Sequence, residues 1–258
     1  MKSLPYTLAT LTCAAFFTPS ATAQHCHDVG GGTDGGVHCL LAHSDQEHLY
    51  CGGSFTTSGG QAMDHACSWD EVAYHAVGTG TGGDVFCFAE FNNGICAGGA
   101  FTTAGSGEAH HVAHWNGSSW NPMGDGFDGP VHCMAVYNGQ LYAGGEFSFS
   151  GNALVKNVAR WDGAAWLPMG AGCDHAVYAM LVHNGLLYIG GEFEHVNGGE
   201  DHGICSWNGS SYASVGGGVS GSGHTVHSLW VYDGQLCVGG TFAQAGGQSA
   251  PNVCRWNG

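Results

Sequence analysis

The chain has very few basic residues and no long apolar stretch beyond its first 23 residues. Only 4 of its 258 residues are Lys or Arg, against 20 Asp and Glu, and one of the four is Lys2. Residues 24–258, with 20 acidic and 3 basic side chains, carry a formal charge of about −17. Such a charge argues against a nucleic-acid partner or an anionic membrane surface, and the lack of a long apolar run predicts no membrane insertion.

The first 23 residues have the pattern of a secretory signal. Lys2 supplies the positive charge, residues 8–17 form an apolar stretch too short to span a bilayer, and Ala21-Thr22-Ala23 forms a small-residue cleavage site. We therefore expect residues 24–258 to be released to the cell exterior or the cell surface, as one domain.

Five segments of the remaining chain align with one another. Each contains the pattern Gly-Gly-x-Phe, which begins at Gly52, Gly98, Gly144, Gly190 and Gly239, in steps of 46, 46, 46 and 49 residues. A tryptophan follows each pattern, at Trp69, Trp115, Trp161, Trp207 and Trp256. Because two independent markers keep one period, they indicate a repeat architecture.

Within a repeat, short β-rich runs alternate with turn signals. In the third repeat, Asn138-Gly139 and Asp162-Gly163 mark hairpins, because type I′ turns need positive φ at both central residues. This pattern gives four antiparallel strands, A to D, in each repeat. We predict an all-β fold, a five-bladed β-propeller. Its blades are expected at residues 37–78, 85–124, 131–170, 177–216 and 226–258.

The last repeat stops after Trp256, before its strand D, and residues 24–36 resemble the missing piece. They are predicted to complete blade five and close the ring, which removes two exposed sheet edges. A two-residue turn at Asn116-Gly117 would pair Ala113 with Trp120. We call the junction between residues 24–36 and the last repeat the seam, and the corresponding pair there is Cys254 with Cys26. A Cys26–Cys254 disulfide is therefore predicted, with Cys237–Cys254 as the competing pair.

Eleven cysteines follow the signal, an odd number that leaves at least one unpaired in a single chain. Several share repeat positions with Ala or Ser, so they are interpreted as small core residues. The strand-A position, expected opposite the first Gly of Gly-Gly-x-Phe, holds Cys39, Cys87 and Cys133; the strand-C position holds Cys67, Cys205 and Cys254.

Three histidines occupy one strand-A position. His38, His132 and His227 alternate there with Phe86 and Tyr178. Strand A lines the channel of a propeller, so three imidazoles there are candidates for ligand binding or for a transition metal. The interpretation we prefer is a position that needs a flat ring packed between blades.

Other polar residues give further candidates. His110, His111 and His114 form a second possible metal cluster, although residues three apart on a strand face opposite sides. Asp125 and Asp128 could offer carboxylates to calcium, although a full ligand loop is lacking.

Glu90 replaces the Ala or Val of other repeats, as an exposed strand end or as a channel-facing carboxylate. Trp115 with Trp120, and Trp161 with Trp166, are expected diagonally on one face of a C–D hairpin, as inter-blade core or as a carbohydrate platform. Asn116 and Asn208 begin glycosylation sequons on predicted C–D turns.

The pattern Ala159-Arg160-Trp161-Asp162-Gly163, followed by Trp166-x-Pro168-Met169-Gly170, resembles a repeat of many secreted bacterial proteins and of the fungal bud-site landmark proteins. These are similar to the kelch and galactose oxidase propeller superfamily. The resemblance implies a propeller in an extracellular or cell-surface setting. It implies no active site, because the copper ligands of galactose oxidase map to no positions here, and the sequence identifies no cofactor.

Near-equivalent blades without a unique polar constellation indicate a non-catalytic binding or adhesion module, whose partner is a glycan or an extracellular protein. A self-assembling subunit of a surface layer or filament is the alternative, because the thiol number is odd and only 9% of residues are charged. A metal-dependent oxidoreductase is third, from the abundance of His and Cys.

Overall fold

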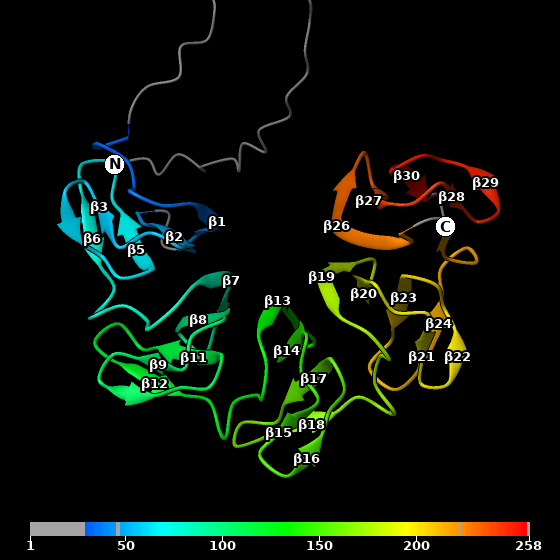
Figure 1. Ribbon diagram of the computed structural model, residues 1–258, viewed down its shortest axis with the longest axis horizontal. Helices are drawn as coiled ribbons and strands as arrows, with labels where there is room; N and C mark the ends of the chain where they lie inside the picture. Colours follow the sequence, from blue (N-terminus) through cyan, green and yellow to red (C-terminus); the bar gives the residue numbers. More distant parts are fainter. Residues whose placement is uncertain (1–28, 45–46, 222, 257–258) are drawn as a thin grey trace, which may run out of the picture.

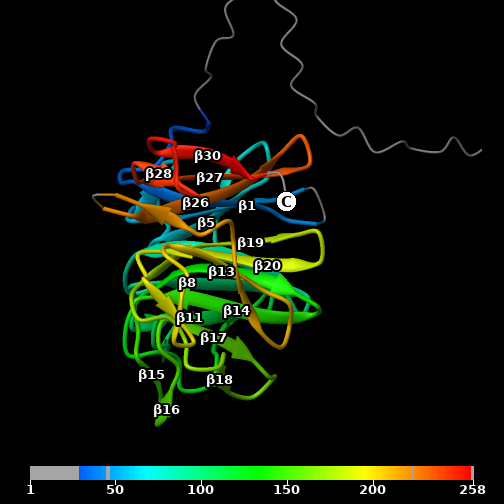
Figure 2. The ribbon, with the colours of Figure 1, turned by 90° about the vertical axis from the view of Figure 1, so that its right-hand side faces the viewer.

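The computed structural model describes residues 29–44, 47–221 and 223–256, in which every regular element is a β-strand. Figure 1 shows the strands grouped in sheets that follow one another around a central axis, and Figure 2 shows the same sheets from the side. The predicted signal and Cys26 lie outside the described residues. The all-β class is confirmed.

Four repeats each fold into a four-stranded antiparallel sheet in chain order. These sheets are β1 (Val37–Ala42), β2 (Leu49–Gly53), β5 (Ala66–Trp69) and β6 (Tyr74–Ala76); β7 (Val85–Phe91), β8 (Gly94–Gly99), β11 (Val112–Trp115) and β12 (Trp120–Pro122); β13 (Val131–Tyr137), β14 (Gln140–Gly145), β17 (Val158–Trp161) and β18 (Trp166–Pro168); and β19 (Val177–His183), β20 (Leu186–Gly191), β23 (Ile204–Trp207) and β24 (Tyr212–Ser214). Within the described residues the last repeat has three strands, β26 (Thr225–Tyr232), β27 (Gln235–Thr241) and β30 (Val253–Trp256).

The connection between the second and third strand of each repeat is itself a small hairpin, where the sequence predicted only a loop. These hairpins are β3 (Thr57–Ser58) with β4 (Gln61–Ala62), β9 (Thr103–Ala104) with β10 (Gly107–Glu108), β15 (Phe149–Ser150) with β16 (Ala153–Leu154), β21 (His195–Val196) with β22 (Gly199–Glu200), and β28 (Gln244–Ala245) with β29 (Gln248–Ser249). The last is joined by β25 (Val219–Ser220). All are two residues per strand, too short for an alternating pattern to identify.

The first Gly of Gly-Gly-x-Phe lets successive repeats approach closely. A Cβ on Gly98 would lie 2.6 Å from a methyl of Val131 and 2.8 Å from Sγ of Cys87, so no larger residue fits without displacement. The same valine-on-glycine contact joins Gly52 to Val85 and Gly144 to Val177. The pattern therefore forms the inner part of each junction, and its Phe is buried in every repeat.

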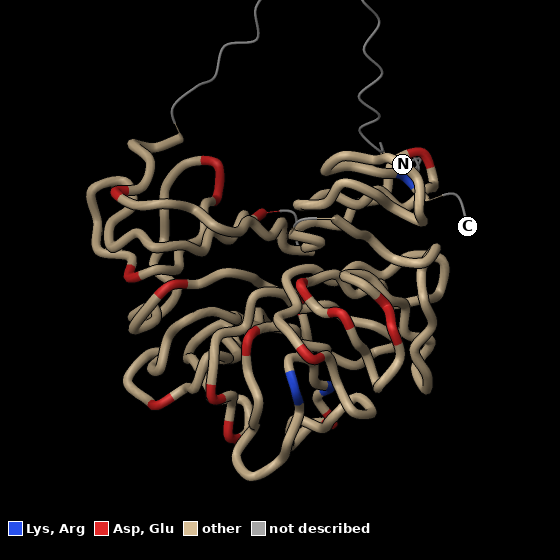
Figure 3. The backbone as a smooth tube through the Cα atoms, turned by 45° about the vertical axis from the view of Figure 1, so that its right-hand side comes forward, with Lys and Arg blue, Asp and Glu red and all other residues tan. Residues whose placement is uncertain are grey.

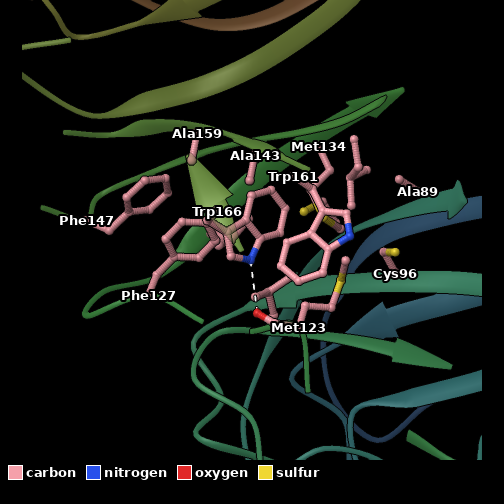
Figure 4. Close-up of a cluster of buried hydrophobic side chains, with 14 of the residues drawn as sticks. Ala89, Cys96, Met123, Phe127, Met134, Ala143, Phe147, Ala159, Trp161 and Trp166 are labelled. Atoms are coloured by element: carbon pink, nitrogen blue, oxygen red, sulfur yellow. Dashed lines mark hydrogen bonds between the residues drawn. The ribbon is translucent and has the colours of Figure 1, made fainter. Parts of the chain in front are cut away.

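Aromatic pairs form the outer part of each junction. Trp161 and Trp166 lie directly opposite each other on β17 and β18, with ring centroids 5.2 Å apart, so the predicted diagonal pairing is wrong. Figure 4 shows Trp166 buried beside Phe127, with its indole N–H donating to the carbonyl of Met123 in the preceding repeat at 3.1 Å. These rings are inter-blade core rather than an exposed carbohydrate platform.

The C–D turns correct the predicted register. Trp115 pairs with Trp120 and Ala113 with Pro122, because the turn has four residues and Asn116 Oδ1 accepts the N–H groups of Ser118 and Ser119. The predicted two-residue turn is therefore wrong here. By contrast, Asn138 and Gly139 both have positive φ between the paired Tyr137 and Gln140, as a type I′ turn requires.

This register bears on the predicted seam disulfide. The C–D register of the other repeats is shifted by two residues from the one on which the Cys26–Cys254 disulfide was predicted. Cys26 lies outside the described residues, so that bond stays a prediction. The competing pair is wrong, because Cys237 pairs with Arg255 while Cys254 pairs with Val238, and the two thiols lie on opposite faces of the sheet.

Residues 29–33 follow the path of an inter-repeat connector. The N–H of Gly32 donates to the carbonyl of Val29, Thr33 forms a bridge with Ser58, and a Cβ on Gly30 would meet the ring of Trp69 at 2.7 Å. The connectors that begin at Val77 and Met169 make the equivalent turn and bridge. Of the predicted closing segment 24–36, the described part is thus a connector into repeat one, and residues 24–28 lie outside the described residues.

The arc of sheets is open between β1 and β26 (Figure 1). Successive inner strands β1, β7, β13, β19 and β26 pack on one another. Apolar side chains on both sides of the opening are exposed, with Val37 at 44%, Leu40 at 61%, Trp230 at 70% and Val253 at 66%. The valines that correspond to Val37 in the other four repeats are fully buried.

Candidate functional site

Five aromatic or imidazole rings form a continuous band along the inner strands. They are His38, Phe86, His132, Tyr178 and His227, one from each repeat, and we call them the ring band. Successive ring centroids lie 5.5, 5.4, 5.2 and 5.6 Å apart, and Phe86 stacks on His132. These contacts agree with the preferred interpretation that this strand-A position needs a flat ring packed between successive repeats.

A β-bulge positions each member of the ring band. In the third repeat Val131 pairs with Gly145 and Cys133 with Gly144, which leaves His132 without a partner in the ladder. The same shift occurs in all five repeats. The residue before the ring faces the core, and the residue after it lies opposite the first Gly, as predicted for Cys39, Cys87 and Cys133.

Polar groups border the ring band. The residue between Gly-Gly and Phe is Glu146 in the third repeat and Glu192 in the fourth, both exposed. The hydroxyl of Tyr178 donates to Glu192 at 3.4 Å, and Nε2 of His38 lies 4.0 Å from Asp84. The ring band therefore combines aromatic rings with carboxylates, and Figure 3 shows how few positions along the backbone are Lys or Arg.

His132 is the central member of the ring band. Its Nε2 atom is buried and has no hydrogen-bond partner among the described residues. Burial lowers the pKa of His132 below its usual value, although the charge of Glu146 opposes the shift. The imidazole is therefore neutral at pH 7, with one nitrogen that donates and one that accepts.

The three histidines of the ring band are not brought together. Phe86 separates His38 from His132, and Tyr178 separates His132 from His227. Within residues 29–44, 47–221 and 223–256, no three His, Cys, Asp or Glu side chains form a group that could hold a metal ion. The predicted metal site at His38, His132 and His227 is not assembled.

The second histidine cluster is also dispersed. His111 Nδ1 lies 3.2 Å from the carbonyl of Gly99, His114 Nε2 lies 3.1 Å from that of Phe91, and His110 is exposed beside Glu108. His111 has a φ of 66°, the left-handed conformation that His65 also adopts at the same repeat position. His110, His111 and His114 thus point to separate partners, and two of them bind backbone.

Asp128 has a structural role that the sequence did not reveal. Its Oδ1 accepts the N–H groups of Ser148 and Phe149, each at 2.8 Å, and so orders the start of the β15–β16 hairpin. Asp34 and Asp174 do the same in repeats one and four. Three Asp at one repeat position were the available signal. Asp125 is exposed beside Gly151 and shares no ligand group with Asp128.

Glu90 was predicted as an exposed strand end or as a channel-facing carboxylate. Instead, its carboxylate contacts the first repeat from β7 of the second. Its carboxylate accepts the N–H of Ser44 at 3.2 Å and also the Ser44 hydroxyl, and it lies 3.7 Å from His43 Nε2. It therefore ties the A–B turn of the first repeat to β7.

Most cysteines are buried in the core, whereas Cys39, Cys237 and Cys254 are half-buried. Cys87, Cys133 and Cys173 are buried, and burial raises the pKa of each well above its usual value, so these thiols stay protonated at neutral pH. They pack as small core residues, as predicted for Cys87 and Cys133. The two sequon residues, Asn116 and Asn208, lie exposed on C–D turns.

Comparison with known proteins identifies the fold. A family model described as a DUF5122 β-propeller domain of unknown function matches residues 233–257. The structure of U3-55K is similar at a TM-score of 0.57 and 14% identity; the match covers 89% of this chain and 63% of that one. The WD40 β-propeller domain of Doa1 matches at a TM-score of 0.42 with 12% identity, over 85% and 77% of the two chains.

No curated protein matches the chain. The chain spans 63% of the length of the U3-55K structure it resembles. The chain is a β-propeller built from repeated four-stranded antiparallel sheets. The part of it that the structure describes contains no helix long and apolar enough to cross a bilayer.

Proposed function

We propose that the chain closes into a five-bladed ring and acts outside the cell as a non-catalytic binding module that holds a glycan on the ring band. Closure is supported by two residues, one on each side of the opening, that would form the valine-on-glycine contact seen between the other repeats. Val37 is the exposed strand-A valine, and Gly239 is the first Gly on which no valine packs; a Cβ added to Gly239 would meet only Oγ of Ser228. Docking β1 on β26 places Val37 over Gly239, as Val131 lies over Gly98.

The edge of β30 supports the same closure. A pocket of about 390 Å³ beside this strand is lined by Val215, Val238, Cys254 and Trp256. In other repeats a strand-D aromatic such as Trp166 fills the corresponding place. Residues 26–28 align with β12 (Trp120–Pro122), with Cys26 at the place of the aromatic ring, and lead directly into the connector at Val29, so they are the strand we assign to this edge.

Closure is tested by two matched alanine substitutions. Gly98→Ala forces a methyl against Val131 and is expected to lower the free energy of unfolding by about 1–3 kcal/mol. Gly239→Ala has the same cost in a closed ring, because Val37 then occupies the equivalent place. Urea unfolding measures both. A Gly239→Ala protein as stable as the parent, beside a destabilised Gly98→Ala protein, contradicts closure.

The binding function rests on one observation, the ring band. Aromatic faces accept the C–H face of a sugar, and the neighbouring carboxylates of Glu146 and Glu192, with the neutral His132, supply hydrogen-bond partners for hydroxyl groups. Five members around one axis present the same kind of contact repeatedly, which suits a multivalent ligand. The resemblance to secreted kelch-like repeat proteins and the signal-like leader favour an extracellular setting.

A glycan array probed with the purified protein tests this function. We expect binding to a defined set of glycans, and at least a tenfold loss of affinity in Phe86→Ala and Tyr178→Ala. Phe149→Ala is the matched control, because Phe149 is an exposed ring on the β15–β16 hairpin. A blank array with a protein captured in pull-downs shifts the proposal to a protein partner. Binding that survives both ring-band substitutions overturns the site.

Self-assembly is the second candidate, and the exposed faces at the opening favour it. The same Leu40 and Trp230 faces, together with the β30 edge, can dock on a second copy instead of on each other. Sedimentation velocity distinguishes the two arrangements: a concentration-independent monomer supports the closed ring, whereas growth into larger species supports a surface layer or filament.

A further inference from the structure

Two cysteines of the first repeat lie directly opposite each other. Cys51 on β2 pairs with Cys67 on β5 in the sheet register, so both side chains extend from the same face. Both residues are buried, in one cluster with Phe55 and Met63. The thiol of Cys51 donates to the carbonyl of Leu49 at 3.9 Å, and the thiol of Cys67 donates to the hydroxyl of Ser58 at 3.8 Å.

The same pair of positions differs in every other repeat. It holds Ala97 and Ala113 in the second, Ala143 and Ala159 in the third, Ile189 and Cys205 in the fourth, and Val238 and Cys254 in the fifth. Two small alanines fill this place adequately, so packing alone does not call for two thiols. The first repeat is the one in which both members are cysteine.

The register suits a covalent bond. Directly opposed residues of antiparallel strands have Cα atoms about 4.5–5.5 Å apart. Disulfides form with Cα separations of roughly 4.4–6.8 Å. A bond between Cys51 and Cys67 therefore requires rotation of the side chains but no shift of β2 against β5.

We propose that Cys51 and Cys67 form a reversible disulfide that staples β2 to β5, with a low-molecular-weight disulfide such as oxidised glutathione as the oxidant. The Cys67 thiolate attacks one sulfur of the oxidant and expels a thiolate. Cys51 then loses its proton and attacks the Cys67 sulfur, which expels the second thiolate. Two protein thiols are oxidised, one small disulfide is reduced to two thiols, and the two protons pass to the leaving groups.

The surroundings favour Cys67 as the attacking group. The neighbouring Cys51 side chain lowers the pKa of the Cys67 thiol, burial opposes this, and the Ser58 hydroxyl, 3.8 Å from the Cys67 sulfur, adds to the lowering. Because both sulfurs are buried in the folded sheet, exchange proceeds while the first repeat is open, during folding or local unfolding. The bond encloses residues 52–66 and so clamps the base of the β3–β4 hairpin.

Peptide mapping of the whole chain tests the proposal. The protein is refolded with a mixture of reduced and oxidised glutathione, its free thiols are blocked under denaturing conditions, and it is digested without reductant. We expect one cross-linked peptide that joins Cys51 to Cys67, 2 Da lighter than the two reduced peptides together, which separates on treatment with a phosphine. Recovery of both cysteines in blocked form, or of either joined to Cys39 or Cys254, overturns the proposal.

Thermal unfolding with and without dithiothreitol gives the second readout. Reduction is expected to lower the melting temperature of the parent protein by roughly 6–12 °C. The double variant Cys51→Ala with Cys67→Ala, which copies the second and third repeats, should show no response to the reductant. Cys205→Ala is the matched control and should keep the full response, since Cys205 faces Ile189. A parent protein that does not respond to reductant contradicts the staple, and the peptide map decides the matter even where a variant fails to fold.

Discussion

Four junctions between successive repeats are closed, and the fifth, between the last repeat and the first, is open in the described residues. At each closed junction a valine of strand A covers a glycine of the preceding repeat. At the opening the two halves are present but apart, Val37 on one side and Gly239 on the other. Every repeat therefore carries both the valine and the glycine of this contact. At the opening the two residues can meet only if the first and last repeats come together.

The largest expected effect comes from the outer part of a closed junction. Trp166→Ala removes a fully buried ring and its hydrogen bond to Met123, so the free energy of unfolding should fall by about 3–5 kcal/mol. Trp230→Ala probes the opening from the inner strand β26: it should cost under about 0.5 kcal/mol if Trp230 stays exposed, and several times more in a closed ring. Guanidinium unfolding followed by circular dichroism measures both. Equal, small effects would show that the junction core is not what holds the repeats.

The next effect concerns the inner contact. Val131→Ala empties the space over Gly98 and should cost about 2 kcal/mol, because Val131 is fully buried. Val37→Ala costs the same in a closed ring and little in an open one. The difference between the two urea midpoints therefore tells whether the seam is open or closed, independently of the Gly98→Ala and Gly239→Ala variants.

A smaller effect is expected from a single hydroxyl. The hydroxyl of Tyr212 donates to the carbonyl of Met169 at 3.0 Å across a closed junction. Tyr212→Phe keeps the ring and should cost about 1 kcal/mol. Tyr232→Phe is the seam counterpart of Tyr137, whose hydroxyl donates to the carbonyl of Gly185 in the next repeat. It should be neutral while the seam is open, because Tyr232 is exposed, and should cost about as much as Tyr212→Phe in a closed ring. A neutral Tyr212→Phe would show that this hydrogen bond does not hold the junction.

The smallest effect is a pH dependence in the connector that leads from the seam into repeat one. Hydrogen bonds from the Thr57 and Thr56 N–H groups and the Thr56 hydroxyl lower the pKa of Asp34 from 3.8 to about 2. A lowered pKa stabilises the fold above pH 4, and this contribution is lost as the pH falls from about 4 to 2. Asp34→Asn should flatten that part of the pH–stability curve. An unchanged curve would show that Asp34 does not order the hairpin.

Much of the fold could be predicted because each repeat confirms the others. Gly-Gly-x-Phe has a steric reason at every occurrence, and Asn138-Gly139 forms the turn its sequence predicts. The C–D turns misled because Asn116-Gly117 looks identical, yet the Asn116 side chain accepts backbone N–H groups and widens the turn to four residues. The Asn-Gly dipeptide alone therefore does not tell a two-residue type I′ turn from a four-residue turn.

The ring band could be predicted only in part. The shared position of His38, His132 and His227 is visible in the sequence, but the bulge that releases them from the ladder is not, because alternation predicts an unbroken strand. The facing thiols of Cys51 and Cys67 were missed for a similar reason. Their pairing depends on the register between β2 and β5, which the intervening hairpin sets.

The bulge in each inner strand separates the ring-band side chain from the pairing of the strands. The bulged residue has no ladder partner, while the valine before it and the residue after it keep theirs. A side chain can therefore be exchanged at any of the five bulges without disturbing strand pairing. If the ring band binds a ligand as proposed, its preference for that ligand can change one residue at a time while the sheets keep their register.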